Sequence, residues 1–177
     1  MLYKRGLSPP FPYLLLTVEF EITMEIILCT KADFDQIIQD ITDFWGDDRT
    51  LHLHHPMFIN EFGNSAFVVK EADRVIAYLF GFLSQTAPVG YIHAIGVRQS
   101  YQRQGLGRRL YDYFTEFARQ KGCSELKALT SPTNMTSIAF HRRIGMELLG
   151  EPNVDGIPVI RNYSGPGIDR VVFRKLI

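Results

Sequence analysis

The clearest pattern in the chain is an apolar, β-rich run over residues 89–97 that is followed, after a short polar turn, by helically spaced apolar positions. Pro88 precedes the run and polar side chains follow it, which predicts a strand. Beyond the turn, apolar side chains recur at steps of three and four and predict one buried helix face, formed by Leu106, Leu110, Tyr113, Phe114 and Phe117. The segment therefore predicts a strand, a turn and an amphipathic helix.

The same patterns divide the rest of the chain into further strands and helices. Strands are predicted at Glu25–Thr30, Ser65–Lys70, Arg74–Ser84, Glu125–Thr130 and Asp169–Lys175. Helices are predicted at Phe34–Trp45, in a shorter stretch within Leu51–Phe62, and at Asn134–Ile144. Residues 147–161 contain two prolines and predict irregular structure. The Arg74–Ser84 run is apolar on both faces, so we expect it at the centre of a sheet.

The turn after the first strand contains two glycines, Gly105 and Gly107, at the predicted helix start. Because glycine has no Cβ, a ligand can approach the free N–H groups of the first helical turn, whose positive end attracts an anion. Arginines are also concentrated here, at Arg98, Arg103, Arg108 and Arg109. We therefore predict that a polyphosphate binds the turn, through Gln102, Arg103, Gln104, Gly105, Leu106, Gly107 and Arg108.

Length and composition favour one globular domain with a small-molecule partner. The chain has 177 residues, a formal net charge of zero and 46% hydrophobic residues. This charge balance argues against a nucleic-acid partner, and no apolar run is long enough to predict a membrane span. The two cysteines, Cys29 and Cys123, form no metal or disulfide motif. We expect a cytoplasmic protein.

The first 23 residues form a separate prediction. Lys4 and Arg5 precede a short apolar stretch, but three prolines interrupt it and two glutamates follow it, so we do not interpret it as a secretory leader. We expect residues 1–23 to be a poorly ordered N-terminal extension and residues 24–177 to be the domain.

The turn lacks the P-loop pattern, and it also lacks the third glycine and the downstream acid of a dinucleotide-binding motif. Its Gln/Arg-x-x-Gly-x-Gly form after a strand resembles the central motif of the GNAT N-acetyltransferase superfamily. A second segment, Asn134–Gly145, resembles the asparagine-to-glycine helix of that family. The resemblance implies a mixed α/β GNAT fold with a mostly antiparallel sheet, splayed between its fourth and fifth strands and flanked by helices. It also implies acetyl-coenzyme A as the cosubstrate and a small-molecule amine as the acceptor.

Acetyl transfer to an amine requires removal of a proton from the amine, because an alkylamine with a pKa near 10 is deprotonated at pH 7 at a cost of about 4 kcal/mol. The predicted strand 89–97 has no Asp or Glu, and His93 is its titratable candidate. Alternation places Tyr91, His93, Ile95 and Val97 on one face of the strand. His93 is a candidate base, and a hydrogen-bonded core histidine is the alternative.

His141 stands where the family resemblance implies a tyrosine that protonates the leaving thiolate, so it is a candidate acid, with a surface histidine or a water as the alternative. Asn134 lies two helical turns earlier, where the resemblance implies contact with the pantetheine arm. The resemblance also implies that backbone N–H groups near Ile95, Gly96 and Val97 polarise the thioester. The histidines at positions 52, 54 and 55 do not have zinc spacing, and we expect no metal.

Two functions remain open from the sequence. The first is direct acetyl transfer to a small amine in a ternary complex with acetyl-coenzyme A. The second is a non-catalytic acyl-coenzyme A-binding or interaction module of the same fold, which the absent carboxylate and tyrosine permit. The sequence leaves the choice between a monomer and a homodimer open.

Overall fold

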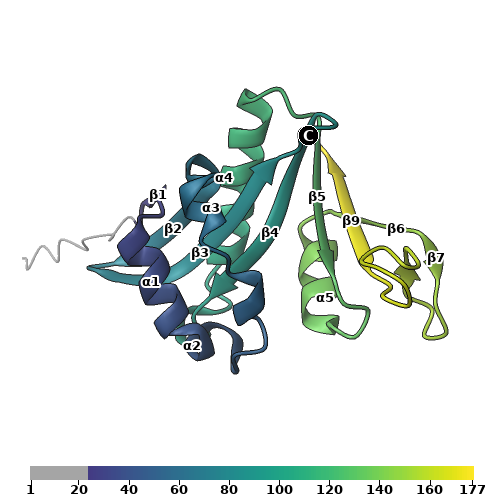
Figure 1. Ribbon diagram of the computed structural model, residues 1–177, viewed down its shortest axis with the longest axis horizontal. Helices are drawn as coiled ribbons and strands as arrows, with labels where there is room; N and C mark the ends of the chain where they lie inside the picture. Colours follow the sequence, from purple (N-terminus) through teal and green to yellow (C-terminus); the bar gives the residue numbers. More distant parts are fainter. Residues whose placement is uncertain (1–23) are drawn as a thin grey trace, which may run out of the picture.

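Seven strands form one sheet in the order β1-β2-β3-β4-β5-β9-β6 in a computed structural model that describes residues 24–177 (Figure 1). Their bounds are Ile26–Leu28, Ala66–Glu71, Arg74–Leu83, Val89–Val97, Glu125–Thr130, Val171–Leu176 and Glu147–Leu149, in that order. All neighbours are antiparallel except β4 and β5. The predicted mostly antiparallel sheet is confirmed, whereas the prediction for residues 1–23 lies outside the described residues.

Helices α1, α2 and α3 follow β1, α4 follows β4 and α5 follows β5. The bounds are α1 Lys31–Gln39, α2 Ile41–Trp45, α3 Met57–Asn60, α4 Leu106–Gln120 and α5 Met135–Arg143. The single helix predicted over Phe34–Trp45 is in fact two helices, because Asp40 leaves the helical conformation at φ −99° and ψ 20°. Thr30 and Asp33 form a capping box that fixes the start of α1.

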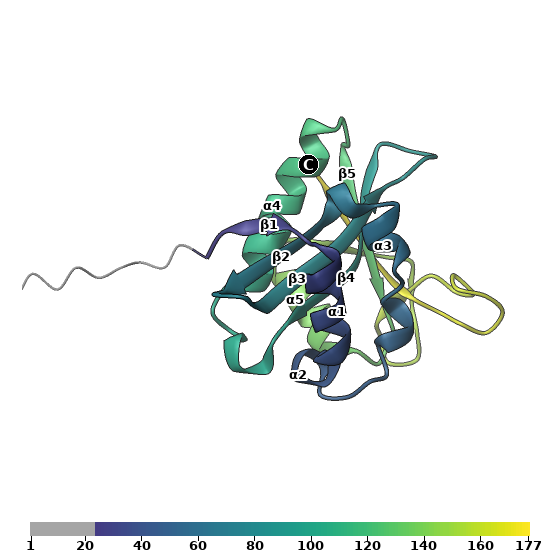
Figure 2. The ribbon, with the colours of Figure 1, turned by 60° about the vertical axis from the view of Figure 1, so that its left-hand side comes forward.

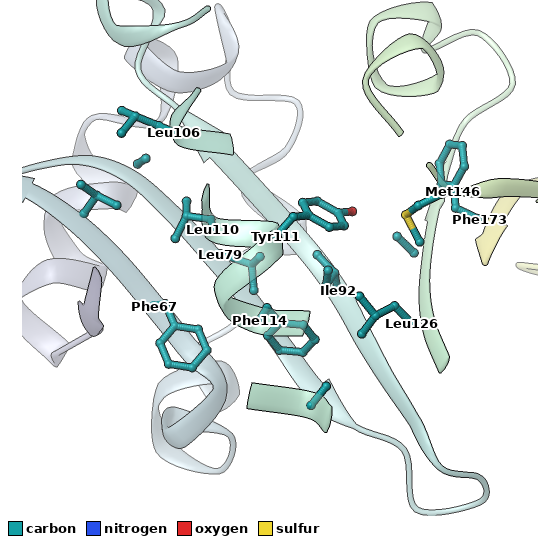
Figure 3. Packing of buried hydrophobic residues seen from close by; sticks show 14 of the residues in the cluster. Phe67, Leu79, Ile92, Leu106, Leu110, Tyr111, Phe114, Leu126, Met146 and Phe173 are labelled. Atoms are coloured by element: carbon teal, nitrogen blue, oxygen red, sulfur yellow. The ribbon is translucent and has the colours of Figure 1, made fainter. Parts of the chain in front are cut away.

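The helices cover the sheet in two layers. Figure 2 shows α1, α2 and α3 on one face of the sheet and α4 on the other. The core on the α4 face also includes α5, and Figure 3 shows part of this cluster, with side chains from α4, β5 and β9. Its labelled side chains include Leu110, Phe114, Leu126 and Phe173. The second core lies under α1–α3 and includes Phe34, Ile37, Tyr78 and Phe80.

The segment before β9 is more regular than the sequence predicts. Residues 147–161 contain strand β6 and a hairpin of β7 (Glu151–Pro152) and β8 (Pro158–Val159). We call residues 160–170 the excursion loop, which is closed by a bridge between Ile160 and Arg170. Among the helices of residues 24–177, none combines the length and the apolar character that a membrane crossing requires.

Candidate active site

Strands β4 and β5 lie side by side for only part of their length. They pair from Val89 opposite Glu125 to Ile92 opposite Ala128, and both strands then continue without pairing with each other. Figure 1 shows the two strands diverging from their paired ends, and we call this divergence the splay. Past Ile92, the edge of β4 that faces β5 therefore has backbone groups that no strand satisfies.

The splay begins at a β-bulge. Phe80 of β3 lies opposite Ala94, whereas the next residue, Gly81, lies opposite Ile92. His93 is therefore the extra residue of β4. A bulge of this kind bends the strand and reverses the alternation of its faces.

The bulge changes the predicted set of neighbours of His93. The ring of His93 stacks on Phe58 of α3, with centroids 4.4 Å apart, so it faces the α1–α3 layer. Ile95 and Val97 instead pack against the core of the α4 layer. The prediction that His93 shares a strand face with Ile95 and Val97 is therefore wrong, because the extra residue shifts the later side chains to the opposite face.

The backbone of β4 beyond the bulge offers donors toward the splay. The N–H of Arg98 donates to the carbonyl of Ile76 in β3 at 2.9 Å. Because backbone N–H groups alternate in direction along a strand, the N–H of Gly96 also points toward β3, while the N–H groups of Ile95 and Val97 point toward β5. Among the three predicted residues, Ile95 and Val97 are therefore the ones whose N–H groups can meet a ligand in the splay.

The turn at the start of α4 presents free donors. Gly105 is the N-cap residue with φ 84°, and it supplies no capping side chain. Among residues 24–177, the N–H groups of Leu106, Gly107 and Arg108 have no acceptor. A Cβ built on Gly105 would meet no atom within 4 Å, so the space before these donors is open. This geometry suits an anion.

The four arginines near this turn have different surroundings. Arg98 is 1% exposed and donates to Val75 O at 2.6 Å, while its guanidinium pairs with Asp40 at 2.5 Å and Asp43 at 2.7 Å. Arg109 donates to the carbonyl of Met24 at 2.7 Å. The expectation that Arg98 adds positive charge to the turn is therefore wrong, because two carboxylates neutralise it in the interior.

The remaining two arginines are available at the surface. Arg103 and Arg108 are exposed, and Arg108 lies 3.6 Å from Asp112 of the same helix. An exposed pair of this kind has little strength and opens readily. Gln102 and Gln104 instead hold the turn itself, because their side-chain amides donate to the carbonyls of Val97 and Ser100 at 3.2 and 3.3 Å.

His93 lies at the start of the splay in a defined tautomer. Its Nε2 lies 2.9 Å from the carbonyl of Leu53, and since a carbonyl only accepts, Nε2 carries the proton. Nδ1 has no partner among residues 24–177 and is not buried. Burial lowers the pKa of His93 below its usual value, so Nδ1 has a free lone pair at neutral pH.

His141 lies in the interior rather than at the surface. It is 4% exposed, and its ring stacks on Phe173 of β9 with centroids 4.0 Å apart. Its Nδ1 donates to the carbonyl of Ser137 at 2.7 Å, and its Nε2 accepts from the hydroxyl of Tyr111. Burial lowers the pKa of His141 to about 4, so it has no acidic proton to give at neutral pH. The surface alternative is therefore wrong, and the acid role stays a prediction that this burial does not favour.

Asn134 also has a local structural task. Its side-chain oxygen accepts from the N–H of Ser137 at 3.0 Å and caps α5. Its amide nitrogen is left as the group that can contact a ligand. The expectation that Asn134 and His141 lie along one ligand does not hold, because His141 is enclosed between Tyr111 and Phe173.

Two polar residues to which the sequence assigned no role, Tyr111 and His54, are buried in these layers. Tyr111 of α4 is buried and Tyr113 is 44% exposed, so the prediction that Tyr113 belongs to the buried helix face is wrong. His54 is also buried, and its ring nitrogens contact the hydroxyl of Tyr78 at 2.6 Å and the carbonyl of Thr50 at 2.8 Å. No sequence signal separates these residues from their neighbours, because each position depends on a partner that is distant in the chain.

Comparisons with known proteins agree with this geometry. The sequence model of the acetyltransferase (GNAT) family matches residues 33–146. An aminoglycoside N(6')-acetyltransferase type 1 from Serratia marcescens is 32% identical over 131 residues, which cover 68% of this chain and 89% of that enzyme. The N-alpha-acetyltransferase RimI from Mycobacterium tuberculosis is 38% identical over 94 residues, covering 52% of this chain and 53% of RimI.

The fold comparison leads to the same group of proteins. The crystal structure of an aminoglycoside 6'-N-acetyltransferase complexed with coenzyme A has a TM-score of 0.63 at 14% identity, covering 86% of this chain and 97% of that one. The family match covers well over half of the chain and includes the bulged strand, the glycine turn and α5. The protein therefore belongs to the acetyltransferase (GNAT) family and is an N-acetyltransferase.

Proposed function

We propose that the protein transfers an acetyl group from acetyl-coenzyme A to the amine of a small molecule, by direct attack in a ternary complex. The observation that carries this proposal is the open helix start at Gly105, with its unsatisfied N–H groups, next to the unpaired edge of β4. One polyphosphate-bearing thioester could use both features. By their names, the relatives described above are an aminoglycoside N(6')-acetyltransferase and an N-alpha-acetyltransferase, so an amine acceptor is common to them.

Each part of acetyl-coenzyme A has a proposed place in the protein. The pyrophosphate binds the N–H groups at the start of α4, with Arg103 and Arg108 adding positive charge. The pantetheine arm follows the open edge of β4. The thioester carbonyl accepts from the N–H of Ile95 or Val97, where a fixed donor stabilises the oxyanion that forms on attack.

His93 is the proposed base. Its unprotonated Nδ1 takes a proton from the ammonium of the acceptor, directly or through one water, and the free amine then attacks the thioester carbon. The new C–N bond forms, the C–S bond breaks, and the electron pair leaves with the sulfur. The attacking nitrogen loses its second proton as the neutral amide forms, and this proton passes through water to the thiolate, because His141 is neutral and enclosed.

The placement of the coenzyme is tested at Gly105. In Gly105→Val the added side chain enters the space before the helix start, so affinity for coenzyme A falls by at least about tenfold in calorimetry. Gly122→Val is the matched control, because Gly122 has φ 83° and equally open surroundings at the other end of α4. Equal affinity in the two variants would show that the pyrophosphate binds elsewhere.

The catalytic function is tested by release of free thiol from acetyl-coenzyme A with a panel of amines. Turnover with any member supports the transferase. Tight coenzyme binding without turnover on a broad panel would instead favour the non-catalytic binding module.

A further inference from the structure

The excursion loop brings an arginine to the same face of the sheet as the proposed base. Lys127 of β5 lies opposite both Tyr91 of β4 and Arg174 of β9, so the three side chains share one face. Val172 lies opposite Leu129 on that face, and Arg170 is two residues earlier in the same alternation. Figures 1 and 2 together show the loop on the side of the sheet that bears α1–α3, to which His93 also points.

The positively charged side chains on this face differ in whether a carboxylate lies beside them. Lys127 lies 3.0 Å from the carboxylate of Glu125, and Arg174 lies 2.8 Å from that of Glu147. Arg170 has no carboxylate within 4 Å among residues 24–177. Of these three side chains, Arg170 is therefore the one without a carboxylate partner.

The guanidinium of Arg170 is held in place without being neutralised. Its Nε donates to the hydroxyl of Ser164 at 3.0 Å, which leaves both terminal nitrogens available. The adjacent carboxylate of Asp169 is turned into the loop, where it accepts from the N–H of Asn162 at 2.9 Å. Arg170 is only partly exposed, so its charge is screened less than that of a fully exposed arginine.

The electrostatic influence of Arg170 extends to Tyr91 of β4. The pKa of Tyr91 is raised, chiefly by burial; Tyr163 raises it further, and Arg170 acts in the opposite direction. Tyr163 and Arg170 thus both lie within electrostatic range of the hydroxyl of Tyr91, which precedes His93 by two residues in β4. The ring of Tyr91 is held by stacking on Phe82, with centroids 4.9 Å apart.

We propose that Arg170 binds a carboxylate of the acceptor, so that the substrate is an amine that also carries a carboxylate, such as an amino acid or a short peptide. This rests on the proposed function, because it assigns the acceptor side of the same site. A guanidinium with two free terminal nitrogens matches a carboxylate in bidentate geometry. An aminoglycoside, which carries several positive charges and no carboxylate, would instead be repelled by Arg170.

The fold also sets the distance between the proposed positions of the acceptor's amine, at His93, and of its carboxylate, at Arg170. β4 and β9 are two strand spacings apart, which is about 10 Å before the splay is added. An arginine side chain spans part of this distance. The acceptor amine and carboxylate are therefore several bonds apart, and ω-amino acids or dipeptides fit better than α-amino acids.

The experiment measures kcat/KM for a series of ω-amino acids of increasing length and for the corresponding primary amides. In the parent protein, kcat/KM for the best ω-amino acid exceeds kcat/KM for its primary amide by at least about tenfold, as expected for a charged hydrogen bond. Arg170→Gln removes this difference, because it raises KM for the acid and leaves kcat/KM for the amide unchanged. Arg170→Lys restores part of the preference for the acid.

Two control variants separate this role from a structural one. Arg161→Gln removes an exposed arginine of the same loop and leaves the acid preference unchanged. Ser164→Ala removes the contact to Nε but keeps the charge, so it retains most of the preference. Equal losses for acid and amide in Arg170→Gln, or a parent preference for aminoglycosides over every carboxylate, would overturn the inference.

A binding measurement keeps the inference separate from the proposed function. Hexanoate is titrated by ligand-observed NMR into the protein saturated with coenzyme A. Hexanoate binding that weakens at least about tenfold in Arg170→Gln supports the carboxylate site. This holds even if no amine is acetylated, a result that would contradict only the proposed function. Hexanoate binding that does not depend on Arg170 removes the carboxylate site and leaves acetyl transfer untouched.

Discussion

The two sides of the splay each contain a histidine, and the two rings have opposite surroundings. On the β4 side, His93 uses one nitrogen to hold Leu53 and keeps the other free and unburied. On the α5 side, His141 has both nitrogens occupied, by Ser137 and Tyr111, and its pKa is lowered to about 4. The same side chain is therefore a candidate base in one half and a packing residue in the other. Its hydrogen-bond partners make the difference.

The largest expected effect is on the rate. His93→Ala lowers kcat at pH 7 by about 100-fold, because general base catalysis contributes about 10²–10⁴-fold. The loss shrinks as the pH approaches that at which the amine deprotonates unaided. Steady-state kinetics from pH 6.5 to 9.5 measure this recovery. His93→Gln is the control, since its amide can still donate to Leu53 while lacking a basic nitrogen; it should be impaired like His93→Ala. A loss below about threefold in both variants would move proton removal to water.

The next effect is on stability and belongs to the other side. His141→Phe can keep the stacking on Phe173 but leaves the buried hydroxyl of Tyr111 without an acceptor, at a cost of about 1–3 kcal/mol in the free energy of unfolding. Urea denaturation measures this loss. The double variant His141→Phe with Tyr111→Phe, which removes both partners, should recover part of it. The rate per folded molecule changes by less than about threefold, and a hundredfold decrease would restore His141 as the acid.

The smallest effect is on the pH dependence of stability. The folded-state pKa of His141, about 4, lies below its ordinary value of 6.5, so the unfolded chain binds the proton more readily. The stabilising contribution of neutral His141 is complete above pH 6.5 and decreases as the pH falls toward 4. Between pH 7 and 5.5 the decrease is about 1 kcal/mol.

His141→Gln isolates this contribution, because the other titrating groups are common to both proteins. The parent should lose about 1 kcal/mol more than His141→Gln between pH 7 and 5.5 in urea denaturation. Parallel pH profiles in the two proteins would show that the ring titrates normally and is not enclosed.

The sequence predicted most of the fold because the signals were local. Periodicity located α4, β4 and β5, and the paired glycines located the helix start that lacks a cap. The predictions failed where a partner distant in the chain decided the outcome. Arg98 looked like part of a basic turn, but Asp40, between α1 and α2, and Asp43 of α2 neutralise it. Tyr111 and Tyr113 are the same residue type in the same helix, and only the packing of α5 shows which of them is buried.

The sequence alone determined the order of the elements, the glycine turn and the two motifs that resemble the acetyltransferase family, because each depends on residues close together in the chain. Tertiary structure decided the tautomers and the pKa values of the histidines, the strand faces beyond the bulge and the position of Arg170. The bulge is defined by pairing with β3, and the pKa of His141 by burial against β9. Burial and strand register depend on contacts between distant segments, and those exist only once the chain has folded.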